Sequence, residues 1–149
     1  MKKYIGTKMI EAAPMSRGEY NRYRGWTIPK DENPADEGYL VKYSDGYESW
    51  SPKKQFEEAY RECDNMTFGL AIEMMKKGKK VARKGWNGKG QYIQLATGIS
   101  YKLGAGKIVN CTHEDIGNKA IAFIGTSGVQ MGWLASQADM LAEDWVVVE

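Results

Sequence analysis

The chain has 149 residues, of which 42% are hydrophobic and 27% are charged, a composition typical of one ordinary globular domain or of two small ones. No run approaches the roughly 20 apolar residues of a membrane span, and the amino-terminal residues 1–8 lack the apolar core of a signal peptide. We therefore expect a folded protein that stays in the cytosol of the cell that makes it.

The first helix is expected after an extended segment at residues 4–13. Ser16 and Glu19 have the spacing of a capping box, in which each side chain accepts a hydrogen bond from an unpaired backbone N–H at a helix start. A short helix through about Tyr23 should follow, with Gly25 placed to close it.

A hairpin and a second helix come next. Aromatic and β-branched runs flank Asp45-Gly46, a pattern typical of a β-hairpin. Ser51 is expected to cap a helix with Pro52 at its first position and with Phe56 and Tyr60 on one face. We interpret residues 1–64 as a small, aromatic-rich α+β unit whose tyrosines serve mainly to bury area in its core.

A polar joint at residues 62–65 predicts a domain boundary near residue 64. Thr67 is expected to cap a helix with one apolar stripe, and Gly78 to mark its exit. Strands are predicted at residues 80–86, 91–95, 120–124, 129–133 and 145–148, and a mobile hairpin loop at residues 98–110. The predicted fold class is therefore α+β, with a helix packed on a small antiparallel sheet in residues 65–149.

Metal and thiol chemistry have little support in the sequence. Cys63 and Cys111 are far apart and show no CxxC spacing. His113 follows Cys111 by two positions, but the partners of a metal-ligand pair or of a catalytic Cys/His pair usually meet through the fold. We expect two free thiols, no metal site and no cofactor.

The net charge of +2 is unevenly distributed along the chain. From Met74 to His113 there is no Asp or Glu. The cations in that span are Lys76, Lys77, Lys79, Lys80, Arg83, Lys84, Lys89, Lys102 and Lys107. Such a span produces a positive field that favours a phosphate-bearing partner, and the alternative is an ordinary solvated basic face.

Residues 81–90 combine cations, an indole, an amide and glycines. Arg83 and Lys84 supply charge for phosphate groups, Trp86 offers a face on which a base can stack, and Asn87 can pair with a base or sugar edge. The alternative, given equal weight, is a β-turn between two strands with Trp86 in the core.

The stretch from Trp133 to Trp145 brings a second indole close to acidic residues. Asp139 and Asp144 can act as a general acid and base, read ribose hydroxyls or pair with the lysines, and the sequence leaves these alternatives open. Trp145 is expected in the core, because the valines after it continue as a buried strand.

Three ordered blocks carry a family resemblance: Met66-Thr67-Phe68-Gly69, residues 79–89 around Gly85-Trp86-Asn87-Gly88, and residues 133–145. Together they resemble a phage family, the second type of Thoeris anti-defence protein, over about residues 66–149. The resemblance implies a homotetramer that binds the cyclic ADP-ribose signal of a bacterial TIR-domain immune enzyme and sequesters it without cleavage. Some members are expected to capture cyclic dinucleotides as well.

The expected ligand-binding residues lie in these three blocks: Phe68, Arg83, Trp86, Asn87, Trp133, Ala135, Ser136, Asp139 and Asp144. The resemblance implies no catalytic residue and places the protein in the cytoplasm of the infected bacterial host. Residues 100–129 look longer than in compact members of the family, which leaves the ligand preference open. The first unit lies outside the resemblance.

Two other functions compete with a nucleotide sponge. A single-stranded nucleic-acid-binding protein also combines basic charge with interleaved aromatics. An enzyme acting on a nucleotide has weaker support, because the chain has one histidine and neither a metal motif nor an activated nucleophile. We therefore expect a non-enzymatic protein that binds a small anion with an aromatic base.

Overall fold

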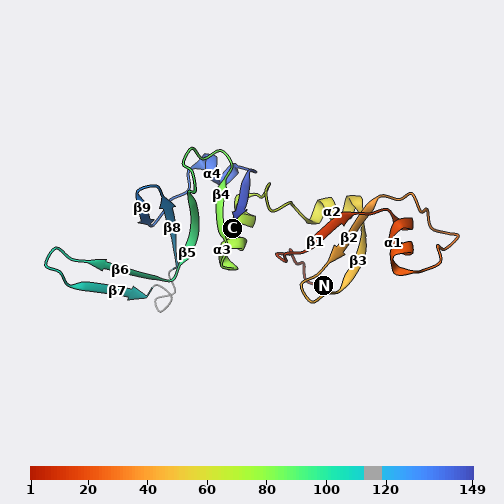
Figure 1. Ribbon diagram of the computed structural model, residues 1–149, viewed down its shortest axis with the longest axis horizontal. Helices are drawn as coiled ribbons and strands as arrows, with labels where there is room; N and C mark the ends of the chain where they lie inside the picture. Colours follow the sequence, from red (N-terminus) through yellow and green to blue (C-terminus); the bar gives the residue numbers. More distant parts are fainter. Residues whose placement is uncertain (113–118) are drawn as a thin grey trace. The chain divides into compact units, whose positions relative to one another are not determined.

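The computed structural model describes residues 1–112 and 119–149. Contacts divide the chain into two compact units, Met1–Arg61 and Glu62–Glu149, each of which combines helices with antiparallel sheet (Figure 1). The α+β fold class is confirmed. In the described part of the chain no helix is long and apolar enough to cross a membrane.

The first unit is built on a three-stranded sheet in the order β1 (Glu11–Pro14), β2 (Gly38–Lys42) and β3 (Glu48–Pro52). It also contains α1 (Arg17–Arg24) and α2 (Lys53–Ala59). The predicted capping box is present, since Ser16 and Glu19 exchange backbone-to-side-chain hydrogen bonds, and Gly25 closes α1 with a φ of 71°. The Asp45-Gly46 hairpin is confirmed as well, because it joins β2 to β3 in antiparallel register.

Two local predictions for this unit are wrong. The N-cap of α2 is Pro52, which has no side chain to accept a hydrogen bond, because Ser51 still lies in β3 and pairs with Tyr39. Only the last part of the extended segment predicted at residues 4–13 forms a strand, because β1 begins at Glu11.

The second unit is built on a five-stranded antiparallel sheet in the order β10-β4-β5-β8-β9. The bounds of the strands are β4 (Lys80–Arg83), β5 (Tyr92–Ala96), β8 (Ala120–Gly125), β9 (Gly128–Met131) and β10 (Trp145–Val148). All five predicted strands are therefore present. Strand β4 ends earlier than predicted, because the N–H of Trp86 turns back to donate to the carbonyl of Arg83.

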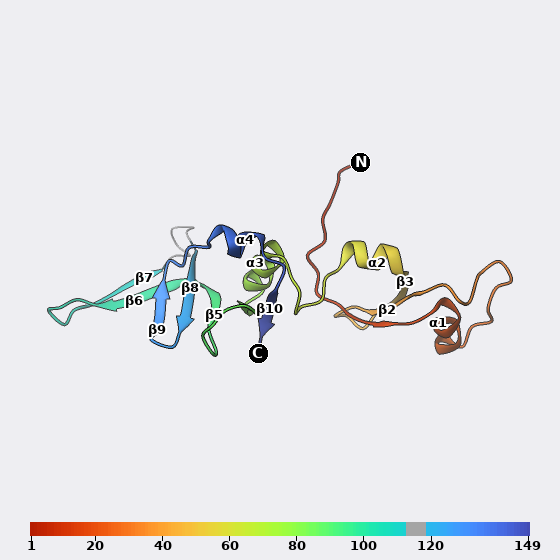
Figure 2. The same ribbon diagram turned by 90° about the horizontal axis from the view of Figure 1, so that it is seen from above.

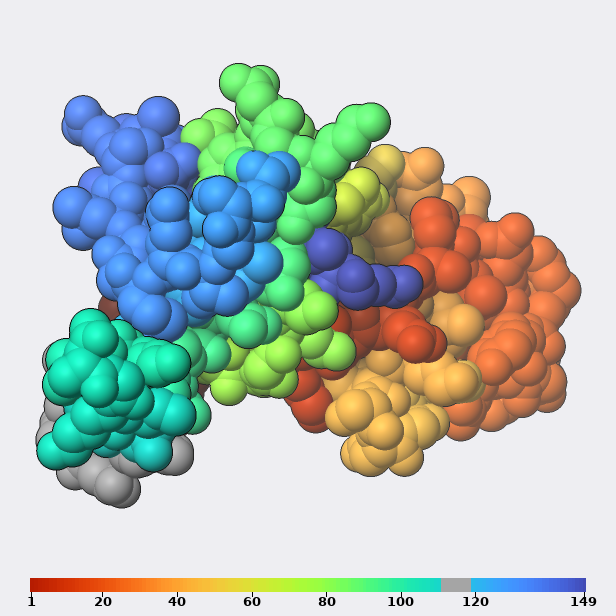
Figure 3. All heavy atoms as spheres, turned by 60° about the vertical axis from the view of Figure 1, so that its left-hand side comes forward, coloured from red at the N-terminus to blue at the C-terminus, as the bar shows by residue number. Residues whose placement is uncertain are grey.

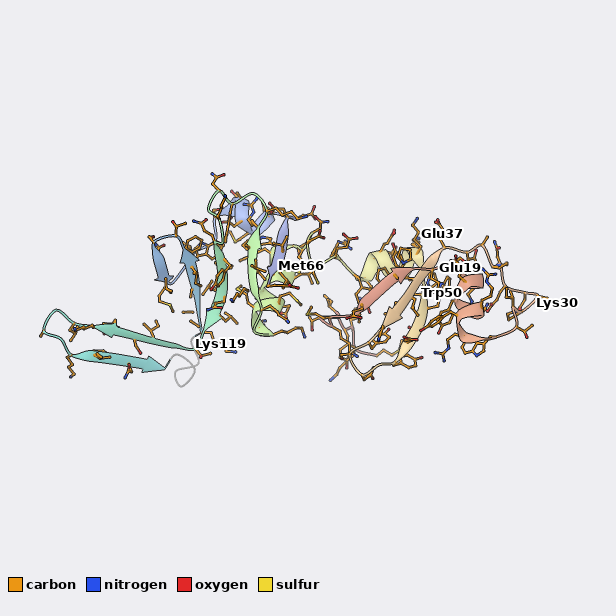
Figure 4. All side chains as sticks on the ribbon, in the orientation of Figure 1. Glu19, Lys30, Glu37, Trp50, Met66 and Lys119 are labelled. Atoms are coloured by element: carbon orange, nitrogen blue, oxygen red, sulfur yellow. The ribbon has the colours of Figure 1, made fainter. Side chains whose placement is uncertain are left out.

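Helix α3 (Phe68–Lys76) packs on one face of this sheet. Thr67 caps it as predicted by accepting a hydrogen bond from the N–H of Leu70, and Gly78 follows the helix with a φ of 82°. The core holds Met66, Ala71, Met74, Met75, Val81, Ile93 and Trp145. Met66, labelled in Figure 4, lies against β10 and exchanges backbone hydrogen bonds with Trp145.

The structure differs from the prediction in two further elements. Residues predicted as a mobile hairpin loop form a hairpin with two regular strands, β6 (Gly98–Lys102) and β7 (Ile108–Thr112), because both arms carry β-formers. A short helix, α4 (Gln137–Leu141), lies beside α3 (Figure 2). It begins with a capping box of Ser136 and Asp139, two residues for which ligand contacts were expected.

Candidate functional site

The turn after β4 and the segment around α4 lie side by side at one end of the sheet (Figures 1 and 3). Arg83, the last residue of β4, joins them. Its Nε donates to Oδ1 of Asp144 at 2.9 Å, and its Nη1 donates to Oδ1 of Asp139 at 3.0 Å. One guanidinium therefore fixes two carboxylates that lie far away in the sequence.

Asp139 is held by several further donors. Its Oδ2 accepts from the N–H of Ser136 at 3.0 Å and from the hydroxyl of Ser136 at 2.8 Å. Burial raises the pKa of Asp139, but hydrogen bonds from Ser136, Arg83 and Trp86 outweigh this effect and leave the pKa below its ordinary value. The backbone carbonyl of Asp139 accepts from the indole N–H of Trp145 at 3.0 Å, so the residue also connects α4 to the core.

Asp144 shapes the turn after β4. Its Oδ2 accepts from the N–H of Gly85 at 3.2 Å, and its backbone carbonyl accepts from the N–H of Lys84 at 3.1 Å. Hydrogen bonding to Arg83 is the largest influence on its pKa, which is lowered. Both carboxylates are thus ionised and paired at neutral pH, whereas a general acid needs a raised pKa. This arrangement does not favour an acid and base pair.

An aromatic cluster lies against this ionic network. The ring of Trp86 lies 5.6 Å from Phe123, 6.0 Å from Trp133 and 5.5 Å from Trp145, measured between centroids. Phe68 lies 5.2 Å from Trp145 and 6.3 Å from Trp133. Trp145 has no exposed surface, which confirms its predicted place in the core.

The other indoles have an intermediate position. Trp86 and Trp133 are half-buried and packed against the core, and each keeps part of its surface open to solvent. They are therefore at once part of the packing and part of the surface. Neither of the two sequence readings of Trp86, a free stacking platform or a core residue, describes this position fully.

The remaining predicted residues border the network. Asn87 is exposed in the turn after Trp86, and Ala135 is half-buried just before the cap of α4. Of the lysines, Lys84 contacts Asn65 at 2.9 Å and Asp64 at 3.6 Å. The carboxylates of Asp139 and Asp144 pair with arginine, and not with the lysines that the sequence reading considered.

Two contributors to the site were missed from the sequence. The N–H of Gly85 holds Asp144, and the ring of Phe123 supports Trp86. Phe123 carries a usable signal, because it alternates with Ile121 on the face of a predicted strand. A backbone donor such as Gly85 leaves no comparable pattern in a sequence.

The other features that were considered give little support to a metal site, a thiol site or a second binding site. Within the described residues no group of three or more His, Cys, Asp or Glu is placed to hold a metal ion. Cys63 is exposed and free, while His113, considered with Cys111, lies outside the described residues. A depression of about 400 Å³ lies in the first unit, and its lining includes Glu19, Glu37 and Lys53 but none of the predicted site residues.

Comparison with known proteins identifies the family of the second unit. The model of the Thoeris anti-defense 2-like domain matches residues 66–148, a range that contains every predicted site residue. The chain belongs to this family. Thoeris anti-defense 2 of Bacillus phage SP01 is 40% identical over 88 residues, which cover 56% of this chain and 94% of that relative. Family membership supports a role in phage anti-defence, and the first unit lies outside the match.

Proposed function

We propose that this protein is a phage anti-defence sponge that binds a cyclic ADP-ribose immune signal and sequesters it without cleavage in the cytoplasm of the infected host. The observation that carries the proposal is the family match over residues 66–148, which spans the ionic network and the aromatic cluster together. Cyclic dinucleotides, which share the aromatic base and the phosphates, are proposed as further ligands.

The chemistry of the surface supports a ligand of this class. Part of Trp86 and part of Trp133 are open to solvent, so a base can stack on either indole. Asn87 is exposed next to Trp86 and offers an amide for a base or sugar edge. Arg83 offsets one of the two negative charges of the nearby carboxylates, and the exposed Lys84 and Lys89 add positive charge that phosphates can approach.

The geometry also divides the predicted residues by role. Arg83, Ser136, Asp139 and Asp144 use their polar atoms on one another, and we assign them to holding the turn after β4 against α4. Direct ligand contact is assigned to Trp86, Asn87, Trp133 and the cations of the turn. Phe68 and Ala135 are proposed to support the wall of the site, since each is half-buried.

We propose a homotetramer as the working assembly. The second unit has only 88 residues between Glu62 and Glu149, and a domain of that size buries limited surface by itself. Association of identical chains adds buried area and can complete a binding site with residues of a neighbouring copy. Light scattering on the purified protein measures the assembly, and a monomer at micromolar concentration contradicts it.

Titration calorimetry with a cyclic ADP-ribose isomer tests the function. Asn87→Ala should weaken binding while leaving the melting temperature unchanged, because the side chain is exposed. Trp133→Ala should weaken binding by roughly ten- to a hundredfold, the usual worth of one stacked base. Because Trp133 also packs on Phe68, Trp86 and Trp145, that variant should melt earlier too, so Asn87→Ala is the cleaner variant.

Two controls complete this test. Lys30→Ala alters an exposed residue of the first unit and should leave binding unchanged. The complex of the unmodified protein, when heated, should release the ligand chemically intact. No measurable binding contradicts the proposal, and recovery of a cleaved product identifies an enzyme instead.

The span without acidic residues between Met74 and His113 favours a single-stranded nucleic-acid binder as the second candidate. The salt dependence of binding separates the two. A protein that neutralises many phosphates loses affinity steeply with salt, whereas a ligand with two phosphates gives a shallow slope. Tight, strongly salt-dependent binding of an oligonucleotide would support the second candidate.

A further inference from the structure

Gln91 is a further polar residue at the edge of the candidate site. Its N–H donates to the carbonyl of Gly88 at 3.5 Å and so closes the turn that joins β4 to β5. Tyr92, the first residue of β5, pairs with Ile124 of β8. One further step of this antiparallel register places Gln91 opposite Gly125. Gln91 therefore belongs to the turn that lies beside α4 (Figure 1).

The side chain of Gln91 lies on the face of the sheet that carries the core. Side chains alternate along a strand, so Gln91 shares a face with Ile93, which is fully buried. The partner of Ile93 in β8 is Phe123, whose ring lies 5.6 Å from that of Trp86. A Cβ built on Gly125 would stand 2.8 Å from the Phe123 ring and 3.7 Å from Nε2 of Gln91. The Gln91 carboxamide and the Trp86 indole are therefore neighbours of the same phenyl ring.

Gly88 makes room for the carboxamide of Gln91. A Cβ built on Gly88 would overlap with the Cδ, Nε2 and Oε1 atoms of Gln91, so the planar amide lies directly over this glycine. Gly88 is not one of the glycines with a positive φ, and its backbone conformation is open to other residues. The absence of a side chain at Gly88 therefore serves the position of the Gln91 amide.

The carboxamide of Gln91 is held in place without a hydrogen bond. Neither of its polar atoms has a hydrogen-bond partner among the described residues. The described part of the chain has no side-chain nitrogen or oxygen that is both buried and unpaired, so both atoms of the half-buried Gln91 reach solvent. An amide oxygen accepts and an amide nitrogen donates. Gln91 can thus present an acceptor and a donor side by side to a ligand.

We infer that Gln91 recognises the edge of the base that stacks on Trp86, and that this base is adenine. The inference rests on the proposed function, because it assigns a role in the same site. Adenine carries a 6-amino donor beside the acceptor N7, and a glutamine carboxamide matches this edge with two hydrogen bonds. Hypoxanthine carries an oxygen at position 6, so its corresponding edge has two acceptors and leaves the amide oxygen of Gln91 unpaired.

The fixed position of the amide favours this recognition. A mobile glutamine side chain loses rotamer freedom when it binds a ligand, and that loss lowers the affinity. The contact with Gly88 already restricts Gln91 in the free protein. A site built to hydrogen-bond a ligand group also discriminates against an analogue without that group, because polar atoms of the site then stay unpaired.

Titration calorimetry on the full chain with a cyclic ADP-ribose isomer tests the inference. Gln91→Met keeps the length of the side chain and removes the amide, so it should weaken binding by about ten- to a hundredfold, the usual worth of a bidentate base contact. Its melting temperature should stay unchanged, because the amide has no partner in the protein. Gln94→Met is the matched control, since Gln94 is a half-buried glutamine on the other face of the same strand. It should leave the affinity unchanged.

The hypoxanthine counterpart of the same ligand separates recognition of the base from an indirect effect. The unmodified protein should bind it at least about tenfold more weakly than the adenine ligand. Gln91→Met should bind the two ligands alike, because the group that distinguishes them is gone. Equal affinity of the unmodified protein for both ligands overturns the assignment of adenine.

Gly88→Ala tests how the amide is positioned. The new methyl group displaces the Gln91 carboxamide without removing it, and the fold should persist because the displaced atoms end a flexible side chain. Binding should weaken by about tenfold, the loss of most of the base contact. Added to Gln91→Met, the same change should cause no further loss, since two residues that act through one contact are not additive. Full additivity contradicts a positioning role of Gly88.

The outcomes distinguish this inference from the proposed function. Absence of binding by the unmodified protein overturns both. Binding by the unmodified protein together with unchanged affinity in Gln91→Met, or with equal losses in Gln91→Met and Gln94→Met, overturns the inference alone. If Gln91→Met fails to fold by circular dichroism, Gln91→Glu replaces it, because glutamate keeps the size of glutamine but has no donor when ionised. Gln91→Glu should also weaken binding by at least about tenfold, and unchanged affinity overturns the inference.

Discussion

Both units are small, and they bury their apolar residues in different ways. In the second unit a fully buried Trp145 and three buried methionines form one continuous core with α3 and the sheet. In the first unit the buried hydrophobic residues are Tyr20 and Val41, and other aromatics stack in pairs, such as Tyr39 on Phe56 at 4.1 Å. The comparison shows that a unit rich in aromatic residues need not bury them, because the burial of a ring depends on what packs against it.

Each unit also contains an arginine that ties distant segments together. In the first unit Arg17 pairs with Glu32, which also accepts from the side chain of Asn21 at 3.1 Å. In the second unit Arg83 holds two carboxylates and, through Asp144, the backbone of the turn. The network in the second unit is adjacent to the half-buried indoles, so its loss should alter both stability and the candidate site.

The largest expected effect comes from the most buried indole. Trp145→Ala should lower the free energy of unfolding of the second unit by about 3–5 kcal/mol, because it leaves a large cavity. Trp26→Ala is the matched control in the first unit, where 52% of the residue's surface is exposed. It should cost about 1 kcal/mol, the worth of its edge contact with Tyr20. Denaturant unfolding measures both, and equal losses would remove the contrast between the units.

The next effect concerns the ionic network. Arg83→Met should cost about 2–3 kcal/mol, because it removes the guanidinium that two part-buried carboxylates share. Arg17→Met is the corresponding change in the first unit and should cost less, since it leaves one carboxylate, which Asn21 still contacts. Urea unfolding at neutral pH makes the comparison.

The same network predicts a pH dependence. The folded-state pKa values of Asp139 and Asp144 lie below their ordinary value of 3.8, so their contribution to stability is present above that pH and is lost as the pH falls through the lowered values. Asp144→Asn should therefore be less stable than the unmodified protein at pH 7, and the difference should shrink in acid. A difference that stays constant as the pH falls contradicts this assignment.

The smallest expected effect is that of removing the first unit. Deletion of Met1–Arg61 should change the affinity for a cyclic ADP-ribose isomer by less than about twofold, a fraction of 1 kcal/mol, because the family match begins at Met66. Calorimetry on the truncated and full chains makes the comparison. Loss of binding by a truncation that still folds would show that the first unit contributes to the site.

Local patterns predicted much of the fold. The capping box of Ser16, the Asp45-Gly46 hairpin, the cap at Thr67 and the strands of the second unit all follow from neighbouring residues, and the structure contains each of them. The error at Ser51 arose where two local signals overlapped, since a strand can continue through a residue that also suits an N-cap. The short α4 was missed because Ser136 and Asp139 were read for their ligand chemistry.

The sequence by itself determined the family and the fold class, because periodicity and ordered motifs are properties of the linear chain. Only the tertiary structure decided which charges meet. Arg83 lies 56 and 61 positions from its carboxylate partners, and a separation of that size carries no local signal. The fold likewise decided that Trp86 and Trp133 keep open surface, since exposure depends on what packs against each ring.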